Sequence, residues 1–132
     1  METYAALKQA AGHYAGERGF CSVVAIATAA GCKFGKARAA MARAGRKTGR
    51  GATVAEINTA AAEFGLNVTY NPALTATLTT LTTATRKLPR RGIFFVYTSG
   101  HISCVRDGLL NDWAAEKNSR KRVTAVAEVT QE

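Results

Sequence analysis

The sequence of 132 residues has no run of about twenty apolar residues, the length that a membrane-spanning helix needs, so no membrane association is predicted. Its first residues, Met1–Tyr4, also lack the basic and then apolar order of a secretory signal. There are only three cysteines, and their spacing fits no zinc pattern. We therefore predict no metal and no cofactor, and a reducing, cytoplasmic setting is the simplest account of the free cysteines.

Acidic residues are scarce, with nine against eighteen lysines and arginines, and the net charge is +9. The basic residues gather in three runs: Lys36, Arg38, Arg43, Arg46, Lys47 and Arg50; Arg86, Lys87, Arg90 and Arg91; Lys117, Arg120, Lys121 and Arg122. Such clustering suits nucleic acid or an acidic protein surface, and the alternative is a solvated charged face. No aromatic residues interleave with these runs, which argues against stacking on single-stranded bases.

The first half of the chain predicts helices. They are expected over Thr3–Ala11, Cys21–Ala30, Phe34–Ala44 and Thr53–Phe64. The second of them is apolar almost all round and should lie buried in the middle of the domain, with Gly31 as its stop. Thr53 and Glu56 form a capping box at the start of the fourth.

The second half predicts strands over Leu66–Tyr70, Gly92–Thr98, His101–Val105, Leu109–Trp113 and Lys121–Val129. Between them, Leu74–Leu88 is rich in threonine, which favours strand, but its leucines fall at helical spacing. We expect one helix there, after a turn at Asn71-Pro72 and before Pro89. Helices followed by an antiparallel sheet predict a single α+β domain over residues 1–132, with the Cys21 helix packed on the sheet.

Cys21 is the candidate nucleophile because it opens a helix. The helix dipole and the free N–H groups there stabilise a thiolate and lower the pKa of the thiol. Neither of the other cysteines has such a position: Cys32 follows a helix end, and Cys104 alternates along a strand.

His101 opens a strand whose hairpin partner ends at Asp112. Asp107-Gly108 is a strong hairpin turn, and a turn centred there sets Ser103 opposite Asp112. Asp112 then lies diagonally across from His101 on the same face, within reach of an imidazole nitrogen. A register shift of one residue would bring Asn111 there instead. A thiol, an imidazole and an orienting carboxylate are the groups of a nucleophilic triad.

These segments resemble the papain-like cysteine peptidase superfamily. The likeness rests on Cys21–Gly31, on Gly100–Val105 and on Leu110-Asn111-Asp112. The most similar branch is the compact bacterial one that includes the bacteriocin-leader peptidases of export transporters. The resemblance implies a papain-like fold, with Cys21 as nucleophile, His101 as general base and acid, and Asp112 as the residue that orients the imidazole.

The chain also resembles small, mostly uncharacterised proteins of bacteriophages and bacteria, over roughly residues 17–112. Those proteins have an acidic residue shortly before the helix cysteine and a basic glycine-rich segment after the next helix. Here these are Glu17 and Gly45–Gly51. A phage origin implies the cytoplasm of the host cell as the location.

The chain departs from the papain-like pattern at the oxyanion donor. Papain-like enzymes usually place a glutamine about six residues before the cysteine, and Ala15 stands there. Gln9 and Glu17 are the candidates for the oxyanion site or the cleft, although Gln9 comes early and an ionised glutamate cannot donate. The backbone N–H of Cys21 supplies one donor.

The segment Gly45–Gly51 is a candidate anion-binding loop. Arg46, Lys47 and Arg50 stand among its glycines, just before a helix N-terminus. Its spacing is not that of a Walker motif, and the alternative is an exposed connector.

Two functions follow as expectations. The first is a papain-like cysteine peptidase, or a related thiol acyl-transfer hydrolase, that uses Cys21, His101 and Asp112 on a peptide or protein substrate, an acidic one in view of the basic runs. The second is a weak or inactive papain-like binding module, phage-encoded, that holds an acidic protein or nucleic acid through the basic clusters.

Overall fold

The computed structural model describes residues 1–112 and 120–131, which form six helices and a five-stranded sheet. The helices are α1 (Tyr4–Ala11), α2 (Cys21–Ala30), α3 (Phe34–Arg43), α4 (Val54–Glu63), α5 (Pro72–Thr77) and α6 (Leu81–Lys87). The strands are β1 (Leu66–Tyr70), β2 (Ile93–Thr98), β3 (His101–Arg106), β4 (Leu109–Leu110) and β5 (Val123–Gln131). The predicted α+β class is confirmed.

The sheet is antiparallel in every pairing and has the order β1-β5-β2-β3-β4. The last strand therefore lies between β1 and β2, far from its neighbours in sequence. The register between β5 and β2 shifts between Tyr97 and Thr98, which is a β-bulge at the end of β2. Bulges re-aim side chains where a regular pleat would not.

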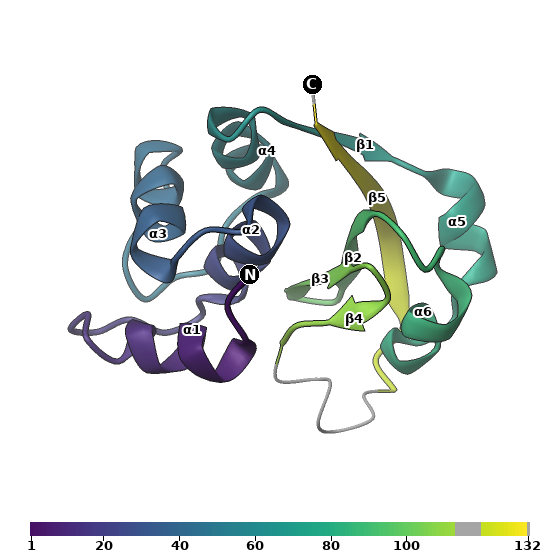
Figure 1. Cartoon of the computed structure of the whole chain (residues 1–132), viewed down its shortest axis with the longest axis horizontal. Helices are drawn as coiled ribbons and strands as arrows, with labels where there is room; N and C mark the ends of the chain where they lie inside the picture. Colours follow the sequence, from purple (N-terminus) through teal and green to yellow (C-terminus); the bar gives the residue numbers. More distant parts are fainter. Residues whose placement is uncertain (113–119, 132) are drawn as a thin grey trace.

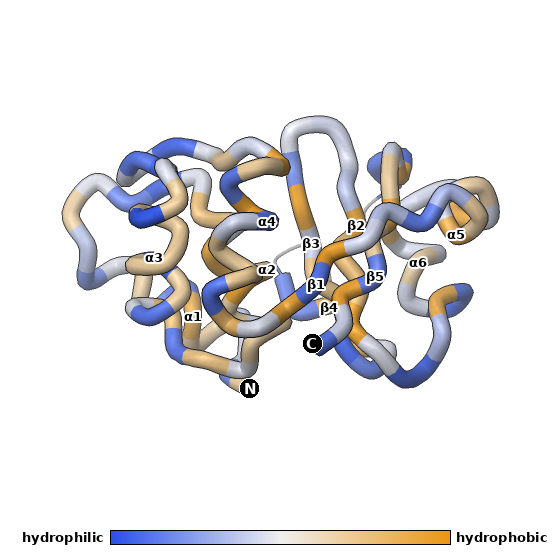
Figure 2. Tube along the Cα trace, turned by 90° about the horizontal axis from the view of Figure 1, so that it is seen from above, coloured by the Kyte–Doolittle hydropathy of each residue, from blue (hydrophilic) through white to orange (hydrophobic). Residues whose placement is uncertain are grey.

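Helices cover both faces of this sheet, and Figure 1 shows α1–α4 on one side and α5 and α6 on the other. The buried side chains accordingly form two clusters. The first joins α1–α4 to one sheet face through Phe95, Ile102 and Cys104, and the second joins α5 and α6 to the opposite face through Phe94 and Val96. Figure 2 shows the hydrophobic segments along β2 and β3 in the middle of the molecule.

Helix α2 lies at the centre of the first cluster, as its composition predicts. Every residue from Ser22 to Ala29 is buried, because small and apolar side chains on all sides let neighbouring elements approach closely. Gly31 ends the helix with φ 69°, in the left-handed region that favours glycine. The first residue of α2 is therefore fixed in position by a rigid, fully packed helix.

The prediction of one helix over Leu74–Leu88 is wrong, because two short helices occupy this stretch. The Asn71 side chain accepts a hydrogen bond from the Leu74 N–H (3.0 Å) and starts α5, with Pro72 at its first turn, so Asn71-Pro72 opens a helix. The chain then becomes extended, and Thr80 pairs with Arg122 in an isolated antiparallel bridge. The threonines at this break favour extended backbone, which allows the pairing with Arg122. The Thr80 side chain also caps the start of α6.

The β3–β4 hairpin turns at Asp107 and Gly108, whose φ angles are 51° and 81°. Arg106 pairs with Leu109 and Val105 with Leu110, which is the predicted register. The prediction of a strand over Leu109–Trp113 is too long, since β4 ends at Leu110; Trp113 lies outside the described residues, as does Lys117 of the third basic run. Within residues 1–112 and 120–131, every helix is too short or too polar to cross a membrane.

Candidate active site

Cys21 is the first residue of α2, and no side chain caps this helix. Thr3 and Thr53, by contrast, accept hydrogen bonds from backbone N–H groups at the starts of α1 and α4. An α-helix leaves its first N–H groups without intrahelical partners. At α2 the Ser22 N–H instead interacts with the Cys21 sulfur and helps to lower the pKa of the thiol, so the start of the helix stabilises the thiolate.

His101 and Asp112 form a buried pair beside this thiol. The His101 Nε2 atom lies 2.8 Å from Asp112 Oδ2, and the two side chains are 6% and 3% exposed. The Ser103 hydroxyl also donates to Asp112 Oδ2. Both contacts reach the same carboxylate oxygen, and Nδ1 is the ring nitrogen left for the hydrogen bond between His101 and Cys21. The predicted diagonal placement of Asp112 across the hairpin is confirmed.

The thiol and the imidazole shift each other's pKa. Burial alone would raise the pKa of Cys21, but hydrogen bonds from His101 and the Ile102 backbone and the charge of His101 outweigh it, so the pKa is lowered. Burial alone would lower the pKa of His101, but hydrogen bonds to Asp112 and Cys21 and their negative charges raise it to about 9. These directions favour a thiolate–imidazolium pair near neutral pH.

The other two cysteines lack this environment. Burial raises the pKa of Cys104, which is fully enclosed in the first cluster, and burial also raises the pKa of the half-buried Cys32. All three cysteines are free thiols. Cys21 is therefore the one whose surroundings favour the reactive thiolate.

Two cavities meet at the thiol–imidazole pair. One, of about 470 Å³, is lined by Cys21, Ser22, Gly51, Ala52, Thr53, Val54, Ile57, Tyr97, Thr98, Gly100, His101 and Ile102. The other, of about 300 Å³, is lined by Tyr4, Gly19, Phe20, Cys21, Val24, Gly100, His101, Asp112 and Lys121. We name them the α4-side cavity and the α1-side cavity. Since both include Cys21 and His101, an extended ligand lying across the pair can occupy a cavity on each side.

Asn111 does not take the orienting position that a shifted register would have given it. Its Oδ1 accepts from the Tyr4 N–H (2.8 Å), and its Nδ2 donates to the Glu2 carbonyl (3.0 Å) and the Thr28 hydroxyl (2.9 Å). The buried amide therefore fastens the N-terminus and α2 to the end of the hairpin.

Glu17 and Gln9 do not provide the expected oxyanion or cleft groups, since neither lines the two cavities. Gln9 is exposed on α1. The Glu17 side chain is fully buried and accepts hydrogen bonds from Arg46 (2.5 Å), Arg38 (2.7 Å) and the Gly49 N–H (3.1 Å). Burial tends to raise the pKa of Glu17, but these hydrogen bonds lower it to about 2.

The same contacts correct the prediction for Arg46. Its guanidinium is buried and also donates to the backbone carbonyl of Arg50 (2.8 Å), so it holds the loop 45–51 in place instead of binding an external anion. Lys47 and Arg50 are exposed on this loop. The ion pairs of Glu17 thereby position Gly51 and Ala52 in the wall of the α4-side cavity.

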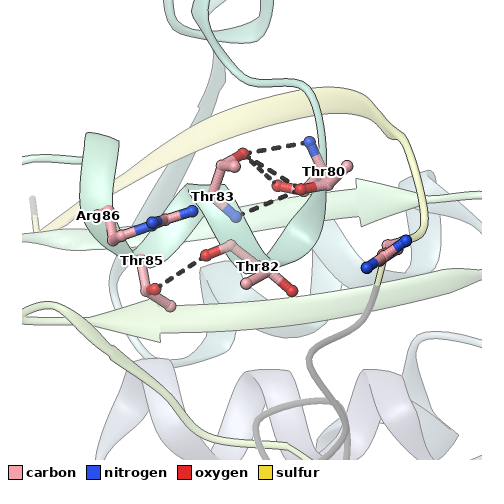
Figure 3. A pocket seen from close by; sticks show the side chains of 6 residues that line it. Thr80, Thr82, Thr83, Thr85 and Arg86 are labelled. Carbon is pink, nitrogen blue, oxygen red and sulfur yellow. Dashed lines mark hydrogen bonds between the residues drawn. The ribbon is translucent and has the colours of Figure 1, made fainter.

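A larger cavity of about 640 Å³ lies away from the thiol, next to α6 (Figure 3). Thr80, Thr82, Thr83, Thr85, Arg86 and Arg120 line it. Several of the threonine hydroxyls already bond to neighbouring residues, as the Thr83 hydroxyl does to the Thr80 carbonyl (2.7 Å) and the Thr85 hydroxyl does to the Thr82 carbonyl (3.2 Å). The second and third basic runs meet at this cavity, since Arg86 belongs to the second run and Arg120 to the third.

Sequence reasoning missed three polar side chains of the α4-side cavity. The hydroxyl oxygens of Ser22, Tyr97 and Thr98 are buried and have no hydrogen-bond partner within the described part of the chain. No local pattern could have revealed them, because α2 and the bulge at the end of β2 meet only in the folded chain. Among residues 1–112 and 120–131, no group of three or more His, Cys, Asp and Glu side chains is placed to hold a metal ion.

No protein-family model, no curated protein and no solved structure matches this chain.

Proposed function

We propose that this protein is a papain-like cysteine peptidase, or a related thiol acyl-transfer hydrolase, whose catalytic residues are Cys21, His101 and Asp112. The observation that supports it most is the hydrogen-bonded series from the Cys21 thiol through His101 to the buried Asp112. A pair of cavities flanking the thiol supplies room for a substrate on both sides of the reacting bond.

In the first half of the reaction, the Cys21 thiolate attacks the carbonyl carbon of the substrate and forms a carbon–sulfur bond. The negative charge that develops on the carbonyl oxygen is stabilised by the backbone N–H of Cys21 at the helix start. The His101 imidazolium then gives its proton to the leaving amine as the carbon–nitrogen bond breaks. This step leaves a thioester on Cys21 and a neutral imidazole.

In the second half, neutral His101 takes a proton from water, and the hydroxide formed attacks the thioester carbon. The carbon–sulfur bond breaks, the Cys21 thiolate returns, and the acid product leaves. An amine in place of water would give transfer in place of hydrolysis. Asp112 keeps the imidazole in one orientation through both halves and stabilises its cationic form.

Cleavage of a broad fluorogenic peptide library tests the proposal. The unchanged chain should cleave at least part of the library, and Cys21→Ala should abolish cleavage. His101→Ala should lower the rate by about 10²- to 10⁴-fold, the usual contribution of a general acid–base. Cys32→Ala is the matched control, because it also removes a free thiol but leaves the site intact. Equal hydrolysis by all four proteins, or none by any, would overturn the proposal.

A second candidate is a binding module with the same papain-like fold and little or no catalysis. The observation that favours it is the oxyanion position: Ala15 offers no donor side chain, and neither Gln9 nor Glu17 lines the two cavities. Such a module would hold an acidic partner through its basic runs, in the cytoplasm of a host cell if it is phage-encoded. This candidate would be favoured if the protein cleaves no peptide of the library and binds an acidic peptide with the same affinity before and after Cys21→Ala.

A further inference from the structure

Three residues with buried, unpaired hydroxyl groups border the α4-side cavity next to Cys21. Ser22 follows the thiol on α2, and Tyr97 and Thr98 end β2. Ser22 is 1% exposed and Thr98 4%, and the three hydroxyl oxygens are the buried side-chain atoms without a hydrogen-bond partner in the described residues. Tyr97 and Thr98 also border a cavity of about 400 Å³, but the α4-side cavity is one that all three residues share. Buried polar groups are nearly always paired, so three residues with unpaired ones in the wall of one cavity indicate a site for a ligand.

A β-bulge at the end of β2 determines where Tyr97 and Thr98 lie. The register shift between β2 and β5 falls between Tyr97 and Thr98, where a regular strand would have continued its alternation. The Thr124 hydroxyl donates to the Tyr97 carbonyl (3.2 Å) and holds the irregular segment. Because a bulge redirects the side chains beside it, the two residues can both border the same cavity.

The remaining lining determines which ligands fit. Apart from Cys21 and His101, no residue around the α4-side cavity carries a charge, and Ala52, Val54, Ile57 and Ile102 give it apolar walls. A carboxylate or an ammonium group placed away from the Cys21–His101 pair would lose its hydration there without gaining a counter-charge. Burial raises the pKa of Tyr97 to about 12, so its hydroxyl keeps its proton and remains a donor.

We propose that the α4-side cavity binds a carboxamide side chain, that of glutamine or asparagine, next to the bond that Cys21 attacks. A primary carboxamide has an acceptor oxygen and a donor NH₂ group, and hydroxyls can donate and accept, so Ser22, Tyr97 and Thr98 complement it. None of the three oxygens is open to the cavity in this structure: those of Ser22 and Thr98 reach a ligand by rotation to another staggered χ1 position, and that of Tyr97 by a small shift of the ring. This inference rests on the proposed function and adds its substrate class.

The first test measures how fast Cys21 is alkylated by chloromethyl ketones that differ in one side chain. Acetyl-X-chloromethyl ketone and acetyl-X-glycyl-chloromethyl ketone are used, with X as glutamine, glutamate or norleucine, which are similar in size. The thiolate displaces chloride and forms a thioether, and mass spectrometry of the digested protein assigns the label to Cys21. The glutamine probe should react fastest in at least one of the two series.

Removal of the hydroxyls should erase this preference. Tyr97→Phe, Thr98→Val and Ser22→Ala should each lower the ratio of glutamine to norleucine rates by roughly two- to tenfold, the value of one hydrogen bond. Equal rates for the three probes, or a ratio that survives in Thr98→Val and Tyr97→Phe, would overturn the inference and leave the thiol site standing. Failure of every probe to label Cys21 would overturn the proposed function, and the inference with it.

Thermal unfolding gives an independent readout that does not depend on catalysis. An unpaired buried hydroxyl costs stability, so Thr98→Val should leave Tm unchanged or raise it. Thr28→Val is the matched control: Thr28 is equally buried, but its hydroxyl accepts from Asn111 Nδ2 (2.9 Å), so its loss should lower Tm. A clear fall of Tm in Thr98→Val would show that its hydroxyl serves the fold and would overturn the inference.

Discussion

His101 interacts with both Cys21 and Asp112, so a change in the protonation of its imidazole changes both interactions. Its raised pKa of about 9 and the lowered pKa of Cys21 define a pH range in which the thiol has lost its proton and the imidazole has kept one. A peptidase needs both conditions, since the thiolate attacks and the imidazolium protonates the leaving amine. The same interactions also stabilise the fold: the contribution of His101 is fully present below pH 6.5 and is lost as the pH rises through about 9.

We predict two different pH profiles for this site. Alkylation of Cys21 by iodoacetamide requires only the thiolate, so at pH 6 it should be at least tenfold faster than alkylation of a free thiol, whose pKa is about 8.5. Peptide hydrolysis also requires the imidazolium, so it should fall again above about pH 9. Rates measured from pH 4 to 10 on the same protein check both profiles. A Cys21 that titrates like a free thiol would contradict the ion pair.

Asp112→Asn should move the upper limb of the hydrolysis profile to lower pH, because hydrogen bonding to Asp112 and its charge raise the pKa of His101. We also expect a loss in rate of roughly tenfold or more, since the imidazole loses its fixed orientation. The matched control is Asp107→Asn in the turn of the same hairpin, where asparagine also tolerates the positive φ. A profile that shifts equally in both variants would contradict a specific role for Asp112.

At this scale the sequence predicted the candidate triad because local rules determine each member. Cys21 begins a helix, His101 begins a strand, and the Asp107-Gly108 turn fixes the register that brings Asp112 across. Glu17 and Arg46 were misassigned for the opposite reason. Their ion pair joins residues 29 positions apart, and no spacing rule indicates that two charged side chains will neutralise each other in the interior.

At the scale of elements, a loop fixed to the residues before α2 forms part of the cavity wall. Glu17 binds the Gly49 N–H (3.1 Å), and an added Cβ at Gly49 would lie 2.7 Å from the Gly16 carbonyl oxygen. Gly49 also has φ 79°, which other residues rarely adopt. The approach of these two backbone segments positions Gly51 beside the α4-side cavity, which links the loop to the candidate active site.

Gly49→Ala should lower the free energy of unfolding by about 1–3 kcal/mol, through the strained φ and the contact with Gly16. Gly51→Ala is its control two residues later: φ is not positive there, and an added Cβ meets no atom within 4 Å, so the change should be within about 0.5 kcal/mol. Urea denaturation of both variants measures the difference. Equal stabilities would show that the close packing of the loop does not matter.

Elements with one dominant signal were predicted with nearly their observed bounds, whereas the threonine-rich stretch was not. In Leu74–Leu88 the leucines favour helix and the threonines favour strand, and each tendency prevails over part of the stretch. The Leu81 N–H bonds to the Lys121 carbonyl (3.0 Å) and the Val123 N–H to the Thr79 carbonyl (3.0 Å), so the break lies where β5 arrives. A strand more than forty residues away in the sequence therefore determines where the stretch divides into two helices.

Across the whole molecule, some arginines form ion pairs with glutamates, whereas others border a cavity. Arg38, Arg43 and Arg46 of the first run form ion pairs with Glu17 or Glu63. Arg86 and Arg120 instead border the cavity of Figure 3, because pairing of Thr80 with Arg122 brings the end of the third run to α6. This side of the molecule is therefore where we expect an acidic partner to bind.

Charge reversal tests this expectation with a matched pair of double variants. Arg86→Glu with Arg120→Glu should weaken binding of a polyglutamate peptide, whereas Lys8→Glu with Lys36→Glu changes the net charge equally but on α1 and α3, and should weaken it much less. Titration by fluorescence anisotropy at 50 and 200 mM salt measures both. Equal weakening would mean that only the net charge of +9 matters. A DNA duplex in the same assay identifies the partner class, since a protein contacting six or more phosphates loses about 10³-fold or more in affinity over this salt range.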